Sequence, residues 1–238
     1  MRFNNIKGFI ECSFVDWPGR VCGVMFLGGC NFRCPYCHNH PLVLEDASLP
    51  SLPFAEVLER LTPLKKWLGG VCISGGEPTL DPELTAILSK LKEQDWQVKL
   101  DTNGSRPFVL KKLLQEQLVD MIAMDIKAPL DDKKYSRCIG RQVNLENIRQ
   151  SINMIQDSGI DHEFRMTVLP LFHSKDDVAE LAARLDTPIK LQNFNPRTTL
   201  DPRMAGEEGF SPEIFTDLQS VTTKTKYQHA GDKLRAAS

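Results

Sequence analysis

The sequence has no apolar run of the ~18 residues that a membrane-spanning helix needs, so we expect no membrane partner. Its first residues, Met1 to Asn5, contain no apolar segment of the secretory-signal kind, which favours a cytoplasmic location. An excess of basic residues is also lacking. The 29 Lys and Arg and the 31 Asp and Glu give a net charge of -2, which gives no reason to expect a nucleic-acid partner.

Internal repeats, linkers and low-complexity segments are absent as well. Hydrophobic residues make up 41% of the chain and charged residues 25%, as is ordinary for a globular protein. The length of 238 residues suits one large α/β domain or two small ones.

Strand-like and helix-like segments alternate along the chain, which predicts a mainly parallel α/β sheet with right-handed crossovers. Six such units suit a partial (β/α)6 TIM-like barrel, followed by a C-terminal helical extension. Polar and Gly-rich motifs follow the strands, at the edge where such folds bind ligands. The expected strands are Val21 to Leu27, Val71 to Ser74, Val98 to Asp101, Met121 to Ile126, Phe164 to Val168 and Ile189 to Leu191.

Helices are predicted between these strands from apolar residues three and four positions apart. Asp81 and Pro82 suit the N-cap and first position of one helix, and Ser174 with Asp177 resembles a capping box for another. The apolar stripes are Phe54, Val57, Leu58 and Leu61; Leu84, Ile87, Leu88 and Leu91; and Leu145, Ile148, Ile152 and Ile155.

The seven cysteines are unevenly distributed. Cys30, Cys34 and Cys37 follow the first expected strand with the spacing C-x3-C-x2-C. A reducing compartment disfavours disulfides, so clustered thiols indicate metal binding or catalysis. Typical [4Fe–4S] centres use four cysteines, so three leave one iron open, as catalytic metal sites usually do.

Two further interpretations of this cluster need weighing against the first. A zinc site could add His38 or His40 as a fourth ligand, although zinc motifs usually come as paired cysteine elements and no second pair exists here. Chance clustering of buried cysteines is the other. The spacing after a strand favours an iron–sulfur cluster over both.

The cysteine motif, with an aromatic residue before its third cysteine, together with Gly75-Gly76-Glu77-Pro78, resembles the radical S-adenosylmethionine superfamily. Within it the chain resembles the glycyl-radical-enzyme activases, above all the anaerobic ribonucleoside-triphosphate reductase activating proteins, with clear similarity to pyruvate formate-lyase activating enzymes. The segments that carry the finer resemblance are Gly8-Phe9-Ile10, Asp16-Trp17-Pro18-Gly19, Tyr36-Cys37-His38-Asn39, Asp101-Thr102-Asn103-Gly104 and Met124 to Leu130.

This resemblance implies a single domain over residues 1–238, with its core at about 8–196 and a C-terminal extension at 197–238. It also implies a [4Fe–4S] cluster and S-adenosylmethionine as cofactors. Reductive cleavage of the latter gives a 5′-deoxyadenosyl radical, which takes a hydrogen atom from a glycine of a partner enzyme. It implies Cys30, Cys34 and Cys37 as cluster ligands and Lys127 as the partner of the methionyl carboxylate. The other cofactor-binding residues it implies are Tyr36, His38, Gly75, Gly76, Glu77, Asp101, Thr102, Asn103, Asp125, Arg165 and Asn195, with Asp101, Thr102 and Asp125 also holding a monovalent cation.

Several of these residues have simpler interpretations. Tyr36 is equally explained as a core aromatic residue, and Asp101 as a capping carboxylate. Asn195 departs from related activases, which often carry a histidine at the end of the sixth strand. His162, His173 and His229 are isolated, and we assign them nothing.

The resemblance predicts activity only without oxygen and an electron from flavodoxin or ferredoxin. Other functions that fit the motifs are a pyruvate formate-lyase-type activase, a small-molecule radical enzyme resembling 7-carboxy-7-deazaguanine synthase, and, from another class, an iron–sulfur electron carrier or a zinc-binding module.

Overall fold

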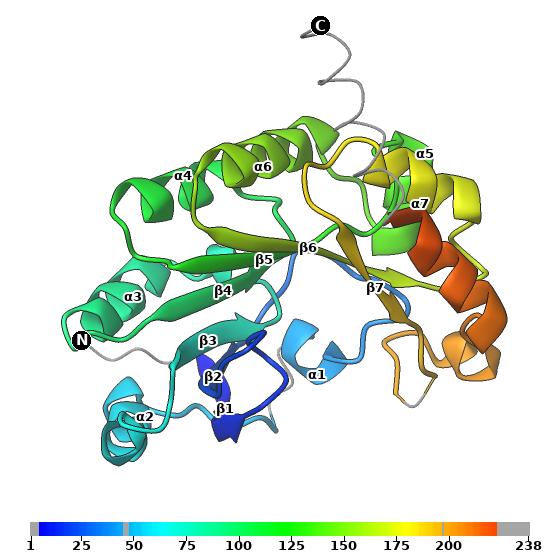
Figure 1. Ribbon diagram of the computed structural model, residues 1–238. Coiled ribbons are helices and arrows are strands. Elements are labelled where there is room, and N and C mark those ends of the chain that lie inside the picture. The colour runs from blue at the N-terminus through cyan, green and yellow to red at the C-terminus, as the bar shows by residue number, and fades with distance from the viewer. Residues whose placement is uncertain (1–4, 45–47, 197, 223–238) are drawn as a thin grey trace, which may run out of the picture. The chain divides into compact units, whose positions relative to one another are not determined.

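The computed structural model describes residues 5–44, 48–196 and 198–222 (Figure 1). Seven strands form one sheet in the order β1-β2-β3-β4-β5-β6-β7. The strands are β1 (Ile6–Ser13), β2 (Cys22–Leu27), β3 (Gly70–Gly75), β4 (Val98–Thr102), β5 (Met121–Asp125), β6 (Asp161–Val168) and β7 (Ile189–Asn193). The helices are α1 (His40–Val43), α2 (Phe54–Leu61), α3 (Leu84–Lys92), α4 (Pro107–Gln115), α5 (Asp132–Ile139), α6 (Leu145–Asp157) and α7 (Lys175–Ala182), with 3-10 turns η1 (Thr62–Leu64), η2 (Pro78–Leu80) and η3 (Pro202–Gly206).

The chain divides into two compact units. The first contains residues up to Arg33, Asn39–Ala123 and Glu146–His162; the second contains Cys34–His38, Met124–Leu145 and the residues from Glu163 onward. None of the described helices is long and apolar enough to cross a membrane.

In the first unit, β2, β3 and β4 run parallel, with Cys22 paired to Gly70 and Val71 paired to Val98. All five residues of β4 are buried, and β2 is buried at all positions except Phe26, as expected for strands covered on both faces. Figure 1 shows α3 beside β4, and α4 beside α6.

The sequence-based prediction missed β1, which pairs antiparallel with β2. Its burial does not alternate, and three consecutive residues, Glu11 among them, are exposed. The expected period-two pattern is therefore absent from its sequence, and the sheet has seven strands instead of six.

The expected helical stripes of the first unit are confirmed, since Phe54, Val57 and Leu61 of α2 are buried, as are the four predicted residues of α3. The predicted start of α3 is wrong. The helix begins at Leu84, because the Asp81 carboxylate accepts the N–H of Glu83 (2.8 Å) after η2 and so caps a turn before the helix.

In the second unit, β6 and β7 are parallel, with Phe164 paired to Ile189. The predicted capping box of α7 is confirmed, with Ser174 and Asp177 each bonding the other's backbone N–H. Helix α5 was not predicted, because most of its residues are charged or polar and only Tyr135, Cys138 and Ile139 are buried.

The expected fold class, α/β with a mainly parallel sheet, is confirmed, and β2 to β7 correspond to the six predicted strands. The predicted C-terminal extension contains η3 and a helix at 212–222. Within the extension, residue 197 and residues 223–238 lie outside the described residues.

Candidate active site

The cysteine segment follows β2 and crosses from the first unit to the second after Arg33. The Gly29 N–H donates to the Leu42 carbonyl (2.8 Å), and the Arg33 guanidinium donates to the carbonyls of Cys30 (2.5 Å) and Phe32 (2.8 Å). The backbone around the first cysteine is therefore held by bonds inside the first unit.

Cys30 is partly exposed, and its sulfur has two N–H groups within hydrogen-bond range. The Phe32 N–H lies 3.4 Å from Sγ, and the Asn103 side-chain amide lies 3.9 Å from it. Donors directed at a sulfur stabilise the thiolate and tune a bound iron–sulfur cluster. This environment fits a thiolate ligand.

Cys34 and Cys37 belong to the second unit, where the Cys37 N–H donates to the Cys34 carbonyl (3.0 Å). Cys34 is buried and Cys37 is partly exposed. Over the described residues, no three His, Cys, Asp or Glu side chains are grouped so as to hold a single metal ion. A [4Fe–4S] cluster differs in that each thiolate binds a separate iron.

Gly75 and Gly76 meet the backbone that leads to the cysteines. Gly75 has φ +121°, and a Cβ there would lie 2.2 Å from the Leu27 carbonyl oxygen. A Cβ at Gly76 would lie 2.0 Å from the Gly29 oxygen and 3.4 Å from the Cys30 Cβ. Only glycine fits both positions, because the chain's own backbone fills the space a side chain would need.

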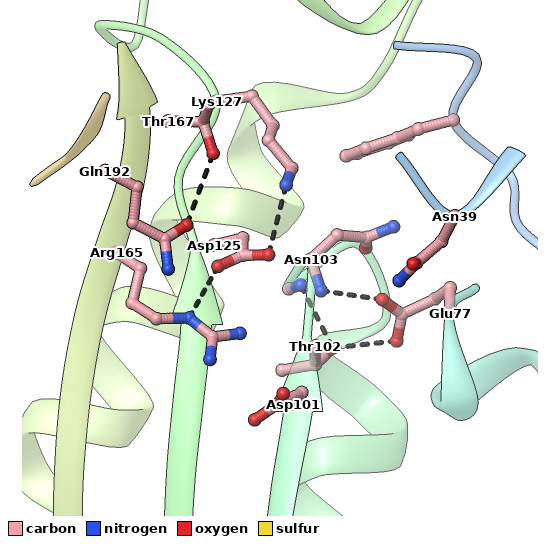
Figure 2. Close-up of polar contacts among 12 residues, drawn as sticks. Asn39, Glu77, Asp101, Thr102, Asn103, Asp125, Lys127, Arg165, Thr167 and Gln192 are labelled. Carbon is pink, nitrogen blue, oxygen red and sulfur yellow. Dashed lines mark hydrogen bonds and ion pairs between the residues drawn. The ribbon is translucent and has the colours of Figure 1, made fainter. Parts of the chain in front are cut away.

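Glu77 is 1% exposed, and both carboxylate oxygens accept hydrogen bonds within the first unit. Oε1 accepts from the N–H and hydroxyl of Thr79 and from the Thr102 hydroxyl (2.7 Å), and Oε2 accepts from the Asn103 N–H (2.6 Å) (Figure 2). Burial raises the pKa of Glu77 although these bonds lower it. Glu77 thus ties the ends of β3 and β4 together.

Asp101 has a cationic partner that the sequence analysis missed. Lys99, two residues earlier on β4, is 0% exposed, and its ammonium forms an ion pair with the Asp101 carboxylate. The Ser74 hydroxyl donates to the other carboxylate oxygen (3.1 Å). The sequence did contain a signal for this ion pair. Lys99 and Asp101 are two positions apart in an expected strand, so their side chains point to the same face.

In the second unit, the two predicted cations converge on Asp125 (Figure 2). Arg165 Nε lies 2.8 Å from Oδ1, and Lys127 Nζ lies 3.1 Å from Oδ2. Burial raises the pKa of Asp125, but Arg165 and Lys127 outweigh it and hold the pKa well below its usual range. Burial lowers the pKa of Lys127, but the Asp125 carboxylate outweighs it and raises that pKa.

These groups form part of a larger charged cluster in the second unit. Arg165 Nη1 also lies 3.8 Å from Glu163, which lies 3.8 Å from Lys190. Lys127, Arg165 and Lys190 thus lie among carboxylates in this unit, and such cationic groups can also bind an anionic ligand group.

The two carboxylates expected to hold a monovalent cation thus have other partners. Asp101 pairs with Lys99, and Asp125 pairs with Arg165 and Lys127, each within its own unit. A monovalent cation at Asp101, Thr102 and Asp125 stays a prediction.

Tyr36 is buried, with its ring 5.8 Å from that of Phe172, and burial raises its pKa well above the usual value. Among the described residues its hydroxyl is buried without a hydrogen-bond partner. His38 stacks on Phe194 at 6.0 Å, and Asn195 follows this residue and is exposed. Adenine binding by Tyr36, His38 and Asn195 stays a prediction.

A hollow of about 700 Å³ lies elsewhere in the first unit, along α4 and α6. Its lining includes Ser105, Phe108, Lys111, Asn147 and Met154. None of the predicted site residues lines it, so it adds nothing to the candidate site.

Comparison with known proteins agrees with these features. The family model described as Radical SAM superfamily matches residues 24–185. The chain therefore belongs to the radical S-adenosylmethionine superfamily, whose members use a [4Fe–4S] cluster and S-adenosylmethionine.

Within the superfamily, the chain belongs to the glycyl-radical enzyme activating enzymes. It is 30% identical over 201 residues to a Methanocaldococcus jannaschii protein of that name, with 82% of each chain covered. It is also 31% identical over 188 residues to the pyruvate formate-lyase-activating enzyme of Clostridium pasteurianum, with 76% of each chain covered.

Solved structures with 16–17% identity share the fold. Streptococcus suis SuiB bound to its precursor peptide has a TM-score of 0.67, and the match covers 87% of this chain but 46% of SuiB. TYW1 with a lysine-pyruvate adduct has a TM-score of 0.56, with 85% and 73% covered.

Proposed function

We propose that this chain activates a glycyl-radical enzyme by removing a hydrogen atom from the Cα of one glycine, and that the partner is an anaerobic ribonucleoside-triphosphate reductase. The electron comes from a flavodoxin or ferredoxin, and the protein acts without oxygen. The observation that carries the proposal is the similarity over 82% of the chain to a protein named as a glycyl-radical enzyme activating enzyme.

Cys30, Cys34 and Cys37 are the proposed cluster ligands, and the donors around Cys30 support this role. When bound, the cluster supplies one electron and S-adenosylmethionine supplies the 5′-deoxyadenosyl group that accepts the glycine hydrogen atom. The protein's own contribution is to bind, orient and exclude water.

In the first unit, the proposed ligand contacts come from backbone. Gly75 and Gly76 offer peptide groups without side chains, and their close packing on the cysteine loop fixes where those groups point. Glu77 acts on them indirectly, since its oxygens are occupied by Thr79, Thr102 and Asn103. We therefore assign Glu77 and Thr102 to positioning the loops.

In the second unit, Lys127 and Arg165 bind the methionyl carboxylate of S-adenosylmethionine. Asp125 pairs with both cations and favours the charged form of Lys127. The two cations support binding of a carboxylate, and Asp125 on its own would repel one.

The choice of a reductase as partner depends on the resemblance of the opening segments. In the structure, Trp17 is 4% exposed and packs with Cys22, Val24, Cys72 and Met121, so part of this resemblance reflects packing within the first unit. A pyruvate formate-lyase is the second candidate partner, favoured by the names of the Clostridium pasteurianum relative and of a Staphylococcus aureus relative with 29% identity over 192 residues.

The test uses the whole chain with its cluster rebuilt under anaerobic conditions. It is incubated with S-adenosylmethionine, a chemical reductant and one partner, and the glycyl radical is measured by electron paramagnetic resonance. We expect the radical with the anaerobic reductase from the same organism. A signal only with pyruvate formate-lyase would replace the partner and keep the activase.

Two controls distinguish the activase from an electron carrier and from a small-molecule radical enzyme. The Cys34→Ala variant should give no radical, since one cluster ligand is lost. If the wild-type protein binds the cluster but never cleaves S-adenosylmethionine, it is an electron carrier. If it cleaves S-adenosylmethionine only when a small molecule is added, it is a radical enzyme of the 7-carboxy-7-deazaguanine synthase kind.

A further inference from the structure

The peptide groups of Lys127 lie outside the helices and strands, so no ladder of backbone bonds fixes them. Two buried side chains of the second unit do so instead. The Lys127 N–H donates to the Tyr135 hydroxyl (3.4 Å), and the Lys127 carbonyl accepts from His173 Nε2 (2.8 Å). Tyr135 is 0% exposed and His173 is 4% exposed.

The bonds of His173 also define the state of its ring. Nδ1 accepts the Leu169 N–H (3.2 Å), so this nitrogen carries no hydrogen. Nε2 must then carry the hydrogen that it donates to Lys127. Burial lowers the pKa of His173, although the bonds to Lys127 and Leu169 raise it, so the ring is neutral around pH 7.

The surroundings of the ring suit this single tautomer. Cys138 Sγ lies 3.6 Å from Nε2, and burial raises the pKa of Cys138 to about 12, so the sulfur stays a neutral thiol. The Phe172 ring lies 6.3 Å away, edge to face. Both ring nitrogens therefore form hydrogen bonds with backbone groups. Lys127 lies in the segment after β5, and Leu169 lies in the segment after β6.

We propose that His173 is a positioning residue for Lys127: by holding the Lys127 carbonyl, it directs the ammonium to a place between Asp125 and an incoming carboxylate. Tyr135 holds the other side of the same residue. The ligand class is the carboxylate of an α-amino acid, here the methionyl group, so this inference rests on the proposed function. Without the hydrogen bonds that its backbone forms with Tyr135 and His173, the flexible Lys127 side chain is free to pair with Asp125 alone.

Two substitutions separate the two ring nitrogens. His173→Gln places an amide N–H near the position of Nε2 and keeps the bond to Lys127. His173→Asn keeps an acceptor near Nδ1 for Leu169 and loses the Lys127 bond. The dissociation constant for S-adenosylmethionine is measured on the cluster-loaded protein from the change in the spectrum of the reduced cluster, and thermal unfolding checks that each variant is folded.

We expect His173→Asn to weaken binding about fivefold and His173→Gln to stay within about twofold of wild type. Lys127→Met should weaken binding about tenfold. In the Lys127→Met background, His173→Asn should have no additional effect, because the residue it positions is gone. Tyr135→Phe keeps the packed ring but loses the hydroxyl. It should weaken S-adenosylmethionine binding when Lys127 is present and have no additional effect in the Lys127→Met background. This variant tests the inference if His173→Asn does not fold.

The outcomes are distinct. Equal losses from His173→Asn and His173→Gln, or the same loss with and without Lys127, would show that His173 only stabilises the fold. Unchanged affinity in His173→Asn would also overturn the inference. If S-adenosylmethionine leaves the wild-type cluster spectrum unchanged, the proposed function itself fails.

Discussion

Lys99 and Asp101 form a buried ion pair two residues apart on β4, and Lys99 has no exposed surface. Cys72 Sγ lies 3.9 Å from the Lys99 ammonium, and burial raises the pKa of Cys72 well above its usual value, so this thiol is neutral. The Asp101 carboxylate, and not the Cys72 thiol, therefore pairs with Lys99 as an anion. Asp101 lies near the end of the strand, where Thr102 and Asn103 follow it.

Replacing Lys99 with Met should destabilise the protein by about 3–5 kcal/mol, because it removes one partner of a buried ion pair. Chemical unfolding would measure the loss. Lys90→Met is the matched control, since the Lys90–Glu93 pair is exposed and should contribute less than about 1 kcal/mol. If Lys99→Met proved as mild as the control, the ion pair would have no structural importance.

Asp125 should give a pH-dependent contribution to stability. Its pKa is lowered in the folded state by Arg165 and Lys127, so the unfolded state binds its proton first as the pH falls. The stabilisation is complete above the unfolded value of about 3.9 and is lost as the pH falls toward the folded value.

Wild type should accordingly be more stable than Asp125→Asn at pH 7 by roughly 1–2 kcal/mol, less than for a fully buried pair because 32% of the Asp125 side chain is exposed. The difference should shrink below about pH 3.9. Urea unfolding of both proteins at a series of pH values measures it, and a constant difference down to about pH 2 would contradict the assignment.

The strands could be predicted because their signal is local. In the expected strand Val98 to Asp101, apolar and charged residues alternate, and the structure extends the strand by one residue. Strand β1 could not be predicted, because its pairing with β2 depends on a distant partner and its own residues show no alternation. Helix α5 was missed because its few buried residues are separated by charged ones.

The site was predictable only in part. The cysteine spacing and the Asp125–Lys127 element are contiguous in sequence, so they could be recognised. The role of Glu77 in joining β3 to β4 depends on Thr102 and Asn103, which are 25 and 26 residues away. His173 lies 46 residues from Lys127, and nothing in its local sequence separates it from an ordinary buried histidine.

Gly76→Ala should lower the amount of cluster that the protein takes up. The added Cβ would lie 2.0 Å from the Gly29 oxygen, so the loop that carries Cys30 must move. We expect at least about a threefold drop in iron per chain after reconstitution, which requires cluster binding to weaken by at least about 0.7 kcal/mol. Gly206→Ala is the control, because nothing lies within 4 Å of a Cβ there. Equal iron contents in the two variants would contradict the prediction.

Asn103→Leu should lower the reduction potential of the cluster. The Asn103 amide is 3.9 Å from Cys30 Sγ and 3.0 Å from the Asn31 oxygen, and an N–H donor at a ligand sulfur favours the more negative reduced state. A bond worth about 1 kcal/mol corresponds to about 40 mV for one electron. A potentiometric titration followed by electron paramagnetic resonance measures the shift, with Asn153→Leu on the exposed face of α6 as the control. If Asn103→Leu and Asn153→Leu have the same reduction potential, Asn103 serves only to hold the loop. The backbone N–H of Phe32, the closer donor at 3.4 Å from Cys30 Sγ, would then be the group that tunes this sulfur.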